Sequence, residues 1–70
     1  MDNIIIEFNI YDSRYRTNPD RATCFEAGCE TLKEAKKSAR EYGSDCVIVR
    51  TVCKHVIRNE WEVIESEIVN

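Results

Sequence analysis

The chain has 70 residues, of which 43% are hydrophobic and 33% are charged. This length allows one small domain, and the composition is that of a folded globular protein rather than a disordered tail. The formal net charge of −3 argues against a general nucleic-acid-binding protein, which would carry a basic surface. The apolar runs are only three or four residues long, as in residues 4–6 and 46–49, and the N-terminus lacks the pattern of a secretory signal. We therefore expect a cytoplasmic protein with a single domain, residues 1–70.

Alternating apolar residues predict two strands in the first part of the chain. Every second position of residues 3–11 is apolar, which is typical of a strand with one buried face. We expect the pattern to continue to Tyr15, before a turn at residues 17–20 that contains Pro19. Residues 21–27 alternate again and predict a second strand, antiparallel to the first, which the following glycine ends.

A helix is predicted to begin at Leu32. Thr31 and Glu34 have the spacing of a capping box, in which the two side chains bond free backbone amides at the start of a helix. Gly43 is a suitable residue to end the helix after about three turns. The residues expected to face the core are Leu32, Ala35, Ala39 and Tyr42.

Two further strands are predicted after the helix. Residues 46–57 and 60–69 are rich in β-branched and aromatic side chains, and residues 58–59 have the length of a tight hairpin turn. The element order is therefore ββαββ. We expect an α+β fold with a four-stranded, mainly antiparallel sheet, one face of which is covered by the helix while the other is open.

The four cysteines are candidates for a zinc site or for disulfides. Cys46 and Cys53 are an odd number of positions apart in one predicted strand, so their side chains should point to opposite faces. This argues against a four-thiolate zinc site together with Cys24 and Cys29, and we expect free thiols instead. The only histidine, His55, has no carboxylate placed to orient it beside Cys53. We predict neither an enzyme nor a metal or cofactor site.

The last predicted strand is acidic. Its carboxylates are Glu60, Glu62, Glu65 and Glu67, and such a strand could imitate a phosphate backbone to a partner protein. A hairpin turning at residues 58–59 sets Arg50 opposite Glu67 and near Glu65, so pairing within the hairpin is the alternative use of these charges.

The same register divides the apolar side chains of the hairpin between two faces. One face holds Val52, Val56, Trp61 and Val63, and the other holds Val49, Cys53, Ile64 and Ile68. If the second set contacts the helix, Trp61 is exposed with three valines, which is typical of a binding hot spot. The alternative is a β-bulge near residues 63–64 that turns Trp61 into the core. The sequence leaves both open.

Two groups of basic residues are candidate anion-binding surfaces. The helix stripe consists of Lys33, Lys36, Lys37 and Arg40. The arginine turn consists of Arg14, Tyr15, Arg16 and Arg21. An aromatic beside guanidinium groups can hold a phosphate or a base, although charges in a turn or along a helix are more often an ordinary solvated surface.

In its type, the chain resembles small phage-encoded anti-defence proteins, of which anti-CRISPR proteins are the best-known group. The resemblance rests on size, acidic charge, a compact α+β pattern and surface patches of one charge sign. It implies a stoichiometric inhibitor that blocks a nuclease or a nucleic-acid recognition surface of a partner protein. From the residues, the candidate contacts are Trp61, Val56 and Val63 with the four glutamates. The alternative is a small homo-oligomeric domain that binds a nucleotide or nucleic acid through the arginine turn.

Overall fold

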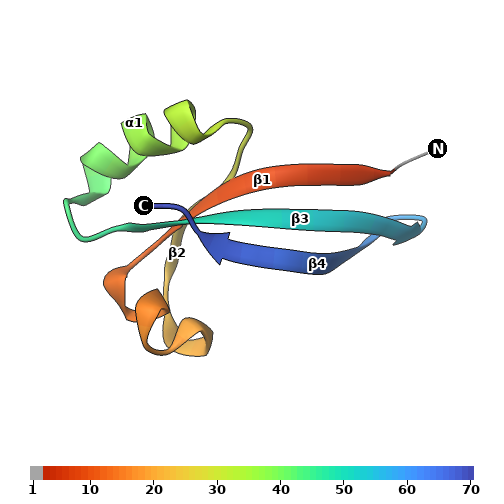
Figure 1. The fold of residues 1–70 in the computed structure, drawn as a ribbon, viewed down its shortest axis with the longest axis horizontal. Helices are drawn as coiled ribbons and strands as arrows, with labels where there is room; N and C mark the ends of the chain where they lie inside the picture. Colours follow the sequence, from red (N-terminus) through yellow and green to blue (C-terminus); the bar gives the residue numbers. More distant parts are fainter. Residues whose placement is uncertain (1–2) are drawn as a thin grey trace.

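The computed structural model describes residues 3–70 and contains a four-stranded antiparallel sheet of order β2-β1-β3-β4 with one α-helix. The strands are β1 (Ile4–Tyr11), β2 (Cys24–Cys29), β3 (Val47–Ile57) and β4 (Glu60–Ile68), and the helix is α1 (Leu32–Tyr42). Two short 3₁₀ helices, η1 (Ser13–Arg16) and η2 (Pro19–Arg21), lie between β1 and β2. Figure 1 shows α1 over one end of the sheet, with the other end extending beyond it. The predicted α+β class and element order are confirmed.

β1 ends at Tyr11, four residues before Tyr15, where the sequence pattern predicted its end. The residue that ends it is Asp12. Its Oδ1 accepts a hydrogen bond from the Arg14 backbone N–H (2.9 Å), which caps η1, and its Oδ2 accepts bonds from the Arg14 side chain and from the Thr23 N–H. The backbone turns away because this carboxylate offers it a local alternative to the ladder. The extension of the strand to Tyr15 was therefore wrong.

The Asp12 contacts predict a loss of stability in acid that depends on this one carboxylate. Hydrogen bonds from Arg14, followed by the bond from the Thr23 N–H, lower the pKa of Asp12 from 3.8 to about 2. Because the folded pKa lies below the unfolded one, the contribution is complete above pH of about 4 and is lost as the pH falls through about 2. We expect Asp12→Asn to be less stable than the wild type at neutral pH, with the difference shrinking below about pH 4 in urea titrations. A difference that stays constant down to about pH 2 would contradict this assignment.

The second strand begins and ends later than the alternation predicted. It starts at Cys24 rather than Arg21, and it continues through Gly28 to Cys29. Gly28 has φ of 83°, and its N–H donates to Oδ1 of Asn9 (2.8 Å). This bond bridges β2 and β1, so the glycine allows an irregular turn of the backbone within the strand rather than ending it.

The helix begins and ends where its caps predicted. Oγ1 of Thr31 accepts a bond from the Glu34 N–H (3.1 Å), and the Gly43 N–H donates to the Ala39 carbonyl oxygen (3.2 Å). Ala35 and Ala39 are buried against the sheet, where the core cluster consists of Ile10, Cys29, Ala35, Ala39, Cys46 and Ile48. Tyr42 is exposed, and its ring stacks on Phe25 of β2.

The sheet is too long for its helix. An 11-residue strand such as β3 extends about 36 Å. The 11-residue helix is only about 16 Å long. The far end of the sheet, residues 4–6, 52–57 and 60–65, therefore extends beyond α1 (Figure 1), and we call it the arm.

The second face of the sheet is covered at the same end as the first. The ring of Tyr15 in η1 packs on Tyr11 with 4.6 Å between centroids, and Val47 and Val49 are fully buried on this face. The prediction of a wholly open second face was therefore wrong near η1. In the arm, by contrast, large apolar side chains remain exposed: Ile4, Ile5, Ile6, Val56, Ile57, Trp61, Val63 and Ile64.

Candidate protein-binding surface

A β-bulge in β4 controls which side chains share a face of the arm. Val52 of β3 is opposite Glu65, but the next residue, Cys53, is opposite Val63, so Ile64 is an extra residue without its own partner. Residues directly opposite one another point to the same side of a sheet, and side chains alternate along a regular strand. The extra residue reverses this alternation between Glu65 and Val63, which is the usual effect of a bulge. A second register shift lies between His55 and Ile57, where Val56 is without a partner in β4.

The bulge places Glu62 and Glu65 on one side of β4 and Trp61 and Val63 on the other. On the helix side of the arm, the cross-strand rows end in carboxylates: Ile4, Lys54 and Glu62 form one row, and Ile6, Val52 and Glu65 form the next. On the opposite side, Ile5, Cys53 and Val63 form one row, and His55 and Trp61 form another. We call this second side the Trp61 face. Without the bulge, Trp61 and Val63 would share a face with Glu65 and Glu67.

The predicted division of the hairpin residues is corrected in two respects. Val52 lies opposite Glu65 on the helix side and does not join Trp61, and Val56 has no partner in β4 because a second register shift lies between His55 and Ile57. The core under the helix contains Ile48 and Ile10, whereas Val49 is buried on the other face. The predicted register failed because it had no bulge.

The predicted bulge is present, but its expected consequence for Trp61 is not. Trp61 remains 45% exposed, and Val63 beside it is 58% exposed. Both point to the face opposite the helix, and η1 covers that face only near Tyr11 and Val47. The side chains are therefore exposed because nothing in the described part of the chain reaches this end of the sheet.

The hairpin turn holds Trp61 in place. Its ring packs against the His55 ring with 4.9 Å between centroids, and the His55 ring hydrogen-bonds to the carbonyl oxygen of Arg58. Arg58 has φ of 49°, a conformation that costs a non-glycine residue free energy. A positioned aromatic loses little conformational freedom when a partner covers it, which suits a contact residue.

The four glutamates remain exposed, and two of them interact with one arginine. Arg50 lies opposite Glu67 as predicted, and its Nη1 is 3.6 Å from Glu67 and 3.8 Å from Glu65. At these distances two exposed carboxylates share one cation, which leaves net negative charge. Glu62 lies opposite Lys54, and Glu60 precedes Trp61 at the hairpin. The helix side of the arm therefore has an acidic outer edge.

The arginine turn does not form one anion-binding cluster. Arg14 forms an ion pair with Asp12 (2.7 Å), and Nη2 of Arg16 donates to the Asn70 carbonyl oxygen (3.0 Å). Tyr15 packs on Tyr11, and Arg21 lies in η2. Two of the three guanidinium groups are thus already bound within the protein, and the aromatic ring is partly covered.

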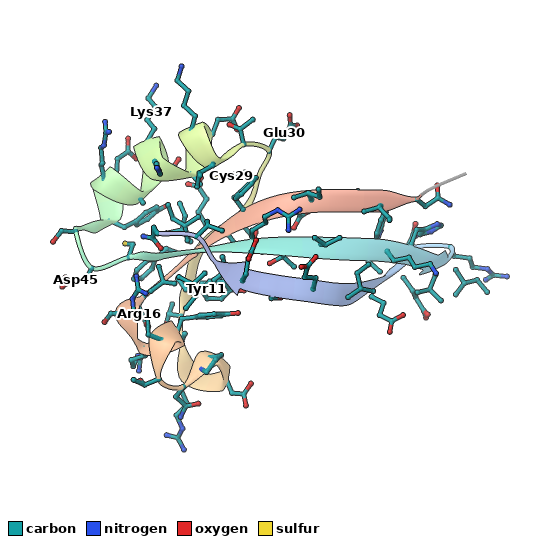
Figure 2. All side chains as sticks on the ribbon, in the orientation of Figure 1. Tyr11, Arg16, Cys29, Glu30, Lys37 and Asp45 are labelled. Atoms are coloured by element: carbon teal, nitrogen blue, oxygen red, sulfur yellow. The ribbon has the colours of Figure 1, made fainter. Side chains whose placement is uncertain are left out.

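The helix stripe remains a solvated basic surface. Its four cations are exposed, and none is in an ion pair found within residues 3–70. Figure 2 shows Lys37 projecting from α1 away from the sheet. A shallow hollow of about 350 Å³ beside the helix is lined by Lys36 and Arg40 over Cys46 and Ile48.

The four cysteines occupy three different environments. Cys29 and Cys46 are buried under the helix, Cys53 is half-buried on the Trp61 face, and Cys24 is exposed. Burial and the neighbouring Glu26 raise the pKa of Cys29 to about 11. Burial and Glu7 raise the pKa of Cys53. These thiols are therefore protonated at neutral pH and are poor nucleophiles.

Comparisons with protein-family models, with curated proteins and with solved structures find no match to this chain. No helix in the described part of the chain is long and apolar enough to span a membrane. Of the candidate contacts, the structure places Trp61 and Val63 together, and it places Glu62, Glu65 and Glu67 on the other side of the sheet. Val56 and Glu60 lie at the second register shift, beside the hairpin turn. Sequence reasoning missed the three isoleucines of residues 4–6 as surface residues, because their alternation is equally typical of a buried strand.

Proposed function

We propose that this protein is a non-catalytic protein-binding module and that the Trp61 face is its main contact surface. The observation that carries the proposal is an apolar patch that the fold itself leaves uncovered: Ile5 is 42% exposed, Trp61 45% and Val63 58%. Small domains rarely expose contiguous apolar side chains without a binding role. A rigid tryptophan among smaller apolar residues has the composition of a hot spot.

The glutamates give the proposed partner a charge. Carboxylates at the edge of the arm would attract a basic surface and speed its encounter with the Trp61 face. Basic surfaces of this kind hold nucleic acid, so we propose a stoichiometric inhibitor that occludes such a surface, as anti-CRISPR proteins do. The proposal includes a cytoplasmic setting, in which the thiols stay reduced. Nucleotide binding through the arginine turn has less support, since Arg14 and Arg16 are already engaged.

The proposal is tested by capture of a partner with matched baits. The baits are the wild type, Val63→Asp and Lys37→Asp. Both substitutions are at exposed positions, so both variants should fold. We expect a host protein to be retained by the wild type and by Lys37→Asp but lost from Val63→Asp. Conversion of Glu62, Glu65 and Glu67 to glutamine should let it elute at lower salt. The proposal is wrong if the wild type retains no protein specifically, or if Val63→Asp retains the same protein equally well.

A further inference from the structure

The outer edge of β1 is open next to the three isoleucines. On this side β1 pairs with β2 only from Phe8 to Tyr11, so residues 4–7 have no neighbouring strand in the described part of the chain. The His55 N–H donates to the Asn3 carbonyl oxygen (2.8 Å). This bond shows which residues of β1 direct their backbone groups toward β3. Because backbone groups alternate in an antiparallel ladder, those of Ile4 and Ile6 point outward from the sheet.

The other edges of the sheet differ from this one. The edge of β4 carries four glutamates and a bulge, both of which are features that keep sheet edges from pairing. The edge of β2 is short, and its register against β1 is irregular. In the open part of β1, Glu7 is charged, but Ile4, Ile5 and Ile6 bring no charge, proline or bulge, and their side chains are 48%, 42% and 43% exposed. An edge of this kind favours the addition of a strand.

We propose that a second copy of this chain fills the edge, with the two β1 strands antiparallel about a two-fold axis at Ile5. In this register Ile4 of each copy is opposite Ile6 of the other, and these two pairs exchange the outward backbone hydrogen bonds. The two Ile5 residues form the non-hydrogen-bonded pair at the axis, where side chains are closest. The same strand is donor and acceptor, so the contact is self-complementary and closes as a dimer.

Two copies could pair through their β1 edges or through their β4 edges, and charge favours the β1 edges. The pairing of two β4 edges would bring glutamates together, whereas the β1 pairing sets isoleucine against isoleucine. The axis is perpendicular to the sheet, so both Trp61 faces lie on the same side of one continuous sheet. The two Ile5 side chains join them into a single apolar surface. The dimer thus goes beyond the proposed function and doubles the surface on which that function depends.

The test uses two variants with equal numbers of new charges. Ile4→Lys with Ile6→Lys sets like charges opposite each other in both pairs, and Ile4→Lys with Ile6→Glu sets opposite charges there. By sedimentation velocity up to about 300 µM, a range that detects weak association, we expect a dimeric wild type, a monomeric Lys/Lys variant and a dimeric Lys/Glu variant. Circular dichroism of each variant checks its fold.

The other outcomes overturn the dimer. If the wild type is monomeric over the whole concentration range, the proposed dimer is wrong. Two variants that are equally dimeric, or equally monomeric while folded, show that Ile4 and Ile6 do not face each other across an interface. If the Lys/Lys variant unfolds, Ile4→Pro replaces it, since it removes only an outward N–H, and a dimer that persists in it contradicts the proposal. None of these outcomes bears on capture of a host protein through Val63.

Discussion

Ile48→Ala should lower the free energy of unfolding by about 3–4 kcal/mol, within the range measured for isoleucine truncation in well-packed cores. Ile48 is 1% exposed and lies in the core cluster with Ile10, Ala35 and Ala39. The alanines leave little side chain to move into the space that the substitution opens. A domain of this size has a total stability of only several kcal/mol, so the variant should be close to unfolded at room temperature.

Ile64→Ala is the matched control for this prediction. The substitution is the same, but Ile64 is the bulge residue and is 50% exposed, so its loss should be below about 1 kcal/mol. Urea denaturation followed by circular dichroism measures both values. Similar losses for the two variants would mean that the arm is packed as tightly as the core under α1, and the account of an uncovered arm would be wrong.

The parts of the fold that depend on local chemistry could be predicted from the sequence. The helix boundaries follow from Thr31 and Gly43, which bond to backbone groups only a few residues away. The pairing of Arg50 with Glu67 agrees with a register counted from the two-residue turn, because the register shifts at His55/Ile57 and at Val52/Cys53 offset each other. The break at Asp12 is also local, but the strand pattern of Tyr11 and Tyr15 concealed it, because a carboxylate that caps a 3₁₀ helix gives no periodic signal.

The surface of the arm could not be predicted in the same way. Alternation shows that a strand has two faces, but it does not tell which face the helix covers or how far along the sheet the cover extends. The covered length depends on how α1 and β3 compare in length and on how β2 directs the chain from the sheet to the helix. These are properties of the whole fold. The bulge could be named as an alternative near Val63, yet its effect on Trp61 depended on whether anything lay above that face.

Trp61→Ala should weaken partner binding by about 2 kcal/mol or more, roughly 30-fold in Kd, while the protein remains folded. A fully buried tryptophan truncated to alanine loses about 3–5 kcal/mol of stability. Trp61 is 45% exposed, and its ring contact is with His55, so the loss here should be only about 1–2 kcal/mol. Because substitutions within an interface act mostly on dissociation, the change should appear mainly as a faster dissociation rate.

Trp61→Phe and Lys37→Ala make this prediction specific. The phenylalanine keeps an aromatic ring on the Trp61 face and should restore most of the binding, whereas Lys37→Ala changes an exposed side chain of α1, away from the arm, and should leave the dissociation rate unchanged. Surface plasmon resonance with the captured partner measures the rates, and urea denaturation measures the stability of each variant. If Trp61→Ala binds as tightly as the wild type, the contact surface lies elsewhere. If Trp61→Ala unfolds instead, the tryptophan supports the fold of the hairpin, and Val63→Asp, which leaves the ring in place, decides whether this face also binds the partner.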